Sequence, residues 1–198
     1  MVLDLNYDKL KVLTHCSTHL AFKEAKNHSS GENIYTFAIY VAPLYRYLLP
    51  IFNTEEALLR SGKIYIESYP DKYHKIKKVT DQIRWNPADW EYQEDYGNYF
   101  NEINKILHDI PEKLDKVDTL EFDFTCQILD DILLTVLLEL DSVGVFNESI
   151  DRNSIVVTIV ENDPDLNSQL EIVKRLNPPE VYRKFKKELE FYFSPRSR

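Results

Sequence analysis

The sequence predicts a single α+β domain in which a small, mostly antiparallel sheet is packed by several helices. The chain has 198 residues, the usual length of one domain, and it is 43% hydrophobic and 29% charged, as globular chains are. Helically spaced apolar residues alternate along it with β-branched and aromatic runs. No repeat and no long flexible linker interrupts it. We therefore expect one domain over residues 1–198, with a core over 5–192 and a loose tail over 194–198.

The first third of the chain predicts a helix, a hairpin and a second helix. Apolar residues at three- to four-residue spacing favour a helix over about residues 5–27. The β-branched and aromatic run 33–41 predicts a strand, and residues 45–52 predict its antiparallel partner. Thr54 or its neighbour Asn53 can cap a following helix, which Ser61 and Gly62 could end. Residues 64–66 fit either a strand or a helix, and the pattern leaves the structure of residues 62–80 open.

The middle of the chain predicts an ordered loop and two helices. Pro87 excludes a regular helix around residues 84–90, so we expect a loop or short strand there, held by two tryptophans. Apolar spacing predicts a helix over 98–110 and a long core helix over 120–140.

The last quarter of the chain predicts a buried strand and two helices. Residues 154–160 are almost continuously apolar, which is typical of a central strand buried on both faces. A turn over 162–165 leads to a helix over 166–176, and Pro179 can begin the final helix.

Charge is distributed unevenly along the sequence. Residues 1–80 carry a net charge of +3, residues 81–171 carry −17 and residues 172–198 carry +5. An acidic zone repels nucleic acid and attracts basic surfaces, although it also fits a solvated face that keeps the protein soluble. With a sequence pI near 5.1, we expect no nucleic-acid partner.

Several features bear on chemistry and location. The two cysteines form no metal or redox motif, and no nucleotide, zinc or hydrolase motif is present. His15 and His19 could share a helix face, but we interpret them as surface or partly buried histidines. Four carboxylates could cluster; we interpret them as a solvated face, with an interface for a basic partner as the alternative. We predict no metal, cofactor or catalytic residue. With no apolar run long enough to span a membrane and no secretory signal, we expect a cytoplasmic protein without membrane contact. The four carboxylates are Asp123, Asp130, Asp131 and Glu139.

An acidic and aromatic segment is the candidate partner-binding surface. Exposed aromatic rings bordered by carboxylates would suit a cationic protein, although the rings could instead belong to the core. The candidate partner-binding residues are Asp89, Trp90, Glu91, Glu94 and Asp95.

A second candidate site surrounds Arg84 and Trp85, near Trp90. Arg84 is one of only five basic residues in the acidic zone, so it could hold an anionic ligand. The alternative is a structural arginine that is stacked or ion-paired within the loop. A deep pocket with a perturbed carboxylate would favour the ligand site, and a filled, flat surface would not.

Several segments together resemble a bacterial family catalogued as domain of unknown function 4303. They are Asn33-Ile-Tyr-Thr-Phe-Ala-Ile-Tyr40, Asn53-Thr-Glu-Glu-Ala-Leu58, Arg84-Trp-Asn-Pro-Ala-Asp-Trp90, Gly144-Val-Phe146 and Arg175-Leu-Asn-Pro-Pro-Glu180. The resemblance covers most of residues 5–192 and implies a bacterial, cytoplasmic α+β protein. It supplies no catalytic residues. By analogy with immunity proteins of the Smi1/Knr4 superfamily, it also suggests a protein encoded beside a secreted toxin.

The leading hypothesis is therefore a non-enzymatic, acidic immunity protein that binds and neutralises a basic cognate toxin. The alternative is a small-ligand-binding protein or an enzyme with a site near Arg84 and Trp90. A third hypothesis is a regulatory or scaffold protein without a toxin. The sequence leaves the oligomeric state open.

Overall fold

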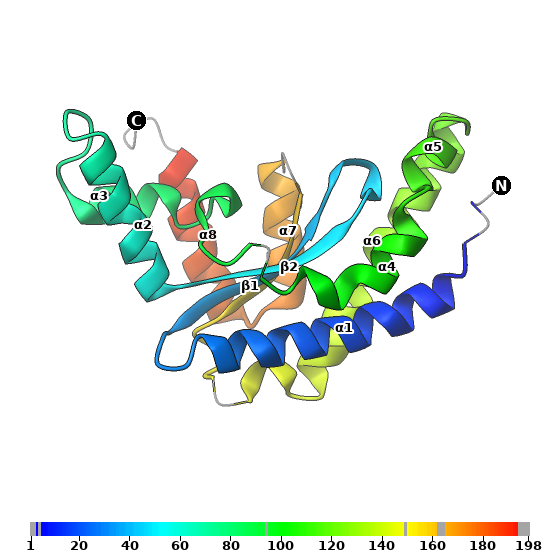
Figure 1. Cartoon of the computed structure of the whole chain (residues 1–198), viewed down its shortest axis with the longest axis horizontal. Helices are drawn as coiled ribbons and strands as arrows, with labels where there is room; N and C mark the ends of the chain where they lie inside the picture. Colours follow the sequence, from blue (N-terminus) through cyan, green and yellow to red (C-terminus); the bar gives the residue numbers. More distant parts are fainter. Residues whose placement is uncertain (1–2, 4, 94, 149, 162–164, 194–198) are drawn as a thin grey trace.

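The computed structural model describes residues 3, 5–93, 95–148, 150–161 and 165–193, and within these ranges it forms an α+β fold (Figure 1). Its helices and strands are α1 (Tyr7–His28), β1 (Ile34–Val41), β2 (Leu48–Thr54), α2 (Glu55–Ser68), α3 (Ile76–Ile83), α4 (Asn101–Leu107), α5 (Ile110–Leu114), α6 (Thr119–Ser142), β3 (Val156–Glu161), α7 (Leu166–Leu176) and α8 (Pro179–Phe193). Short 3-10 turns join some of them: η1 (Pro43–Tyr45), η2 (Pro87–Asp89), η3 (Gly97–Phe100) and η4 (Val145–Asn147). The predicted tail, 194–198, lies outside the described residues.

The three strands form a mixed sheet in the order β2-β1-β3. β1 and β2 are antiparallel, as predicted, whereas β1 and β3 are parallel. The central strand is β1, so the prediction that residues 154–160 form a central strand is wrong. β3 is almost continuously apolar because side chains on both of its faces are buried, even though it pairs with only one strand.

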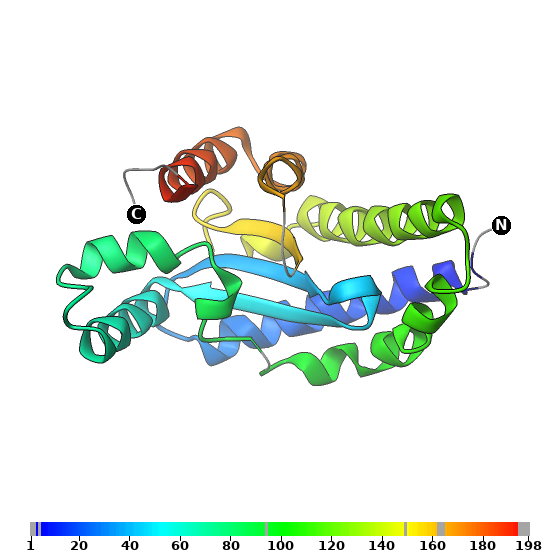
Figure 2. The ribbon, with the colours of Figure 1, turned by 90° about the horizontal axis from the view of Figure 1, so that it is seen from above.

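Helices cover both faces of the sheet, as Figure 2 shows, with α1 on one side and α7 and α8 on the other. Phe37 and Ile39 of β1 and Val157 of β3 point to the first face, where they pack in the main core with Phe22 of α1 and Leu137 of α6. The alternate positions of the strands form smaller clusters on the second face. Successive residues of a strand point to opposite faces of the sheet. The apolar strands β1 and β3 therefore contribute side chains to a core on each face.

Most predicted helices are confirmed within a few residues, and their caps follow the sequence signals. Thr54 accepts a hydrogen bond from the backbone N–H of Ala57 and begins α2, as predicted. α6 extends over Thr119–Ser142, and Gly144 after it adopts φ +84°, a left-handed conformation that glycine favours. α7 has the predicted bounds, and Pro179 is the first residue of α8.

Three local predictions differ from the structure. Gly62 lies inside α2, where its missing Cβ lets Ile76 of α3 approach; a Cβ there would come within 2.8 Å of Ile76 Cδ1. Residues 62–80 accordingly form the end of α2, a turn and most of α3. Residues 98–110 are divided among η3, α4 and the start of α5, in which Pro111 occupies an early helical position that tolerates proline. Tyr45 belongs to the turn before β2, where Leu44 and Tyr45 both have positive φ.

On each outer edge of the sheet, an asparagine side chain pairs with the backbone of one strand residue. Asn177, after α7, donates to the carbonyl of Val157 at 2.7 Å and accepts from its N–H at 2.8 Å. On the opposite edge, Asn104 of α4 donates to the carbonyl of Leu48 at 3.0 Å and accepts from its N–H at 2.8 Å. Each amide supplies the donor and acceptor that a neighbouring strand would supply, so these edge groups are paired without a further strand.

Candidate functional site

Arg84 lies at the junction of α3 and the following loop. Its guanidinium donates to both carboxylate oxygens of Glu55 at 2.8 and 2.6 Å and lies 4.6 Å from the ring centre of Tyr35. Glu188 of α8 lies 4.0 Å from Arg84 Nε. The backbone carbonyl of Arg84 accepts from the Tyr35 hydroxyl and from Trp90 Nε1. Two carboxylates thus compensate the one cation, which leaves little attraction for an anionic ligand.

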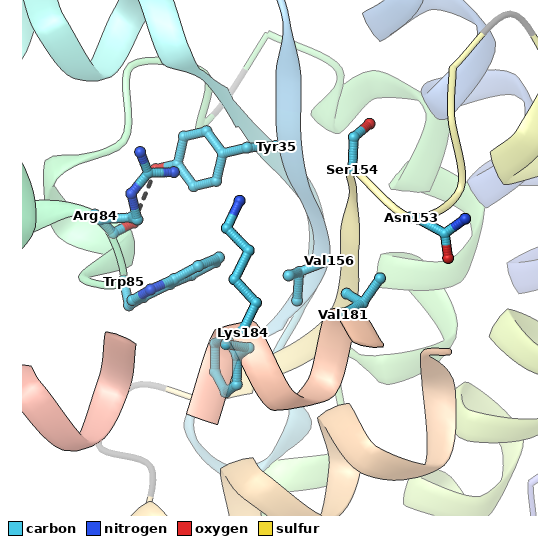
Figure 3. Close-up of a pocket in the computed structure, with 9 residues that line it drawn as sticks. Tyr35, Arg84, Trp85, Asn153, Ser154, Val156, Val181 and Lys184 are labelled. Carbon is cyan, nitrogen blue, oxygen red and sulfur yellow. Dashed lines mark hydrogen bonds between the residues drawn. The ribbon is translucent and has the colours of Figure 1, made fainter. Parts of the chain in front are cut away.

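The space beside Arg84 is a small notch, whose lining residues Figure 3 shows. Trp85 forms one wall, where it packs edge-on against Tyr35 and Phe185 and donates to Glu188 at 3.0 Å. Lys184 of α8 reaches up between Trp85 and Val156. The notch has room for about one water molecule. It is therefore far smaller than a pocket for an organic ligand, which has a volume of several hundred Å³.

Trp90 is buried rather than displayed to a partner. It is 3% exposed and packs between Ala38 and Ile51 of the sheet and Val160 of β3. Its indole N–H donates to the carbonyl of Arg84 at 2.9 Å. Trp90 therefore anchors the loop to the second face of the sheet, and in this structure it cannot itself contact another protein.

The carboxylates near Trp90 are largely occupied by internal contacts. Asp89 accepts from the Tyr65 hydroxyl of α2 and from the side chain of Asn86. Glu91 accepts from Arg60 Nε at 2.9 Å and from Arg60 Nη2 at 3.0 Å. Asp95 is exposed, and Glu94 lies outside the described residues. The structure thus gathers these residues in one loop but neutralises much of the charge at Glu91.

Arg60 of α2 links this loop to Glu32, which precedes β1. Besides Glu91, it donates to Glu32 at 2.6 Å. The Tyr92 hydroxyl and the Thr54 hydroxyl also donate to Glu32, at 3.1 and 2.6 Å. Hydrogen bonds from Arg60 are the main reason that the pKa of Glu32 falls to about 2. Tyr92 also stacks on Phe52 of β2, so this ring contact and the hydrogen bonds to Glu32 together hold the loop against the sheet.

A different acidic region lies at one end of the molecule. α4, α5 and the start of α6 lie at the right-hand end in Figure 1, and residues 101–142, which contain these three helices, include eleven acidic and three basic residues. α2 and α3 lie at the opposite end, and residues 55–83, which contain them, include six basic and five acidic residues. We call the first region the acidic end. The two regions therefore differ in net charge, −8 against +1.

Asp130 lies on α6 at the acidic end, with its carboxyl group against the turn before β2. It accepts a hydrogen bond from Tyr45, whose hydroxyl also donates to the carbonyl of Cys126 at 3.2 Å. Burial of the carboxyl group raises the pKa of Asp130, and the neighbouring Asp131 raises it further. Burial and Asp130 likewise raise the pKa of Glu161 at the end of β3. Sequence reasoning placed Asp130 in a candidate carboxylate cluster, but it had no signal for Glu161 or Tyr45.

The two histidines singled out on α1 differ in burial: His15 is half-buried and His19 is exposed. Within the described part of the chain, no three His, Cys, Asp or Glu side chains form a group that could hold a metal ion. Nor, in the same ranges, is any helix both long and apolar enough to cross a membrane.

The fold and these surfaces define a mixed α+β protein with an acidic end. A family model for a domain of unknown function, DUF4303, matches residues 16–178. The chain therefore belongs to this family. No curated protein and no solved structure is significantly similar to it.

Two of the family-like segments, residues 84–90 and 175–180, hold neighbouring elements of the fold together. Arg84 and Trp90 fasten the loop to the sheet through the contacts of the Arg84 carbonyl. Asn177 fills all four of its side-chain hydrogen-bonding positions, with Val157, with the carbonyl of Val173 and with Arg152. These residues need no ligand to account for their chemistry.

Proposed function

We propose that this protein is a non-enzymatic binding protein for a basic protein partner, and that the partner is a toxin which it neutralises. The observation that carries the proposal is the acidic end, where eleven acidic residues outnumber three basic ones within residues 101–142. A surface of one sign raises the rate of encounter with a partner of the opposite sign. An acidic inhibitor can also cover a phosphate-binding cleft with its own carboxylates, as neutralisation of a nuclease would require.

The acidic end supports this proposal more strongly than the loop around Trp90 does. Asp89 and Glu91 use their hydrogen-bonding capacity inside the molecule. A partner would have to compete with Arg60 for Glu91, which lowers the gain from that contact. Among the described carboxylates of the predicted set, Asp95 is exposed and Asp89 and Glu91 are hydrogen-bonded within the molecule, so the loop offers less free charge than the acidic end.

The alternative, a small-ligand site near Arg84 and Trp90, has less support. It needs a cation free to bind an anion and a pocket able to enclose it. Glu55 occupies the guanidinium of Arg84, and the adjacent notch holds about one water molecule. We therefore favour the protein-binding function.

The test is affinity capture of the tagged full chain from its native lysate, followed by isolation and assay of what is captured. We expect one stoichiometric protein of high pI, whose association rate falls by on the order of tenfold as salt is raised. Expression of that protein alone should arrest growth, and co-expression of this chain should restore it. An acidic partner, salt-independent association or unrelieved toxicity would contradict the proposal.

A further inference from the structure

The first half of α6 presents an exposed face that combines apolar and acidic side chains. Leu120 is 81% exposed and Phe124 is 52% exposed, which is unusual for large apolar residues. Three aspartates on the same part of α6 are exposed as residues, although the carboxyl group of Asp130 is partly covered by Tyr45, and an exposed glutamine lies between Phe124 and Asp130. We call this set the α6 face; it consists of Leu120, Asp123, Phe124, Gln127, Asp130 and Asp131.

The spacing of these residues places them on one side of the helix. Leu120, Phe124, Gln127 and Asp131 follow one another at intervals of four, three and four, which forms a single stripe. Asp123 and Asp130 are seven residues apart and flank the stripe on one side. The stripe is about 17 Å long, or three turns, at 1.5 Å per residue. Ridges of this kind accept the side chains of a second helix laid across them.

Unlike several other carboxylates, the aspartates of the α6 face form no ion pair with a basic residue among those that the structure describes. Glu32, Glu55 and Asp141 are each paired with an arginine within 2.7 Å. None of the ion pairs found among the described residues includes Asp123, Asp130 or Asp131. Asp130 has a tyrosine hydroxyl, and the charged neighbour that raises its pKa is acidic.

We propose that the α6 face is the docking surface for a basic amphipathic helix of the protein partner. An apolar side chain of that helix would cover Leu120 and Phe124, and its lysines or arginines would pair with the three aspartates. The assignment of a basic helix follows from charge complementarity and from the three-turn length of the stripe. It rests on the proposed function, because it specifies where the basic partner binds.

Placement at the acidic end makes this docking site effective. The surrounding carboxylates of residues 101–142 would attract the partner from a distance, and the α6 face would supply the close contacts. Covering the exposed ring of Phe124 removes apolar surface from water, which gives the interface an attraction that salt does not screen. Charge would thus govern association, and the two apolar residues would slow dissociation.

The test compares two triple variants that remove the same charge from the same end of the molecule. The face triple changes residues of the α6 face, and the control triple changes exposed residues around α5. The face triple is Asp123→Asn, Asp130→Asn and Asp131→Asn; the control triple is Asp109→Asn, Glu112→Gln and Asp115→Asn. The amide oxygen that Asp130→Asn introduces could still accept the hydrogen bond from Tyr45, so the face triple should fold, as circular dichroism would verify.

Affinity for the captured basic partner should fall by on the order of a hundredfold in the face triple, and by less than about threefold in the control triple. Phe124→Ala should raise the dissociation rate roughly tenfold, whereas Val12→Ala, at a similarly exposed site on α1, should not.

Equal losses in the two triples, or no effect of Phe124→Ala, would overturn the α6 face while leaving the proposed function intact. If the wild-type chain captures no basic partner, a synthetic amphipathic helix of leucine and lysine, about 18 residues long, serves as the probe. Chemical-shift changes confined to residues 120–131 would support the docking site even though the proposed toxin is absent. No shift there would overturn it.

Discussion

Replacing Asn177 by alanine removes the side chain that closes the β3 edge of the sheet. Its amide donates to the carbonyls of Val157 and Val173 at 2.7 and 2.8 Å, and its oxygen accepts from the N–H of Val157 at 2.8 Å and from Arg152 at 3.1 Å. Asn177 is only 9% exposed, so water cannot readily replace these contacts. Asn177→Ala therefore leaves three backbone groups without their partner.

The expected loss follows from the number of groups left unpaired. Each buried donor or acceptor that loses its partner costs about 1–3 kcal/mol, so two groups of Val157 and one of Val173 give a loss of about 3–5 kcal/mol after partial rehydration. That is a large share of the roughly 5–15 kcal/mol by which a domain is stable, and it corresponds to a fall of roughly 10 °C in Tm.

Urea unfolding followed by circular dichroism measures this loss. The matched control is Asn153→Ala, at an exposed asparagine whose side chain contacts Asp151, and it should change stability by less than about 0.5 kcal/mol. A loss below about 1 kcal/mol for Asn177→Ala would refute the view that this amide replaces a strand.

Two further predictions concern pH. The pKa of Glu32 is lowered from 4.5 to about 2, so its contribution to stability is complete above pH 4.5 and disappears as the pH falls toward 2. Arg60→Met should therefore make the urea midpoint less sensitive to acid between about pH 5 and about pH 3, and an unchanged acid profile would contradict the role of Arg60. The pKa of Asp130 is raised instead, so the folded state loses stability as the pH rises through its folded value. Asp130→Asn removes this loss and keeps an acceptor for Tyr45, so urea unfolding at neutral pH should show equal or higher stability; a clear decrease would show that the charge itself stabilises the turn.

Local sequence signals were sufficient for most of the secondary structure. Side-chain spacing repeats every 3.6 residues in a helix and every two in a strand, so α1, α6 and the β1–β2 hairpin could be predicted from neighbouring residues alone. Thr54, Gly144 and Pro179 fix helix boundaries through contacts or backbone angles that involve only nearby residues.

Sequence reasoning failed where a distant element decided the outcome. Gly62 resembles a helix end, but α3 packs against it and the helix continues past it. The apolar run of β3 resembles a central strand, but Asn177 closes its outer edge. Ile76 is far from Gly62 in the sequence, and Asn177 is far from Val157. Neighbouring residues therefore gave no sign of either contact.

For the candidate binding surfaces, too, the sequence was enough for one property and the fold was needed for another. Residue types alone determined that the protein is acidic and that its charge is segregated along the chain. Only the tertiary structure decided which charges remain available, because it joins Glu91 to Arg60 and Arg84 to Glu55 and leaves the aspartates of the α6 face without a cation among the described residues. Charge is a property of each side chain, whereas its compensation depends on which distant side chains the fold brings within a few ångströms.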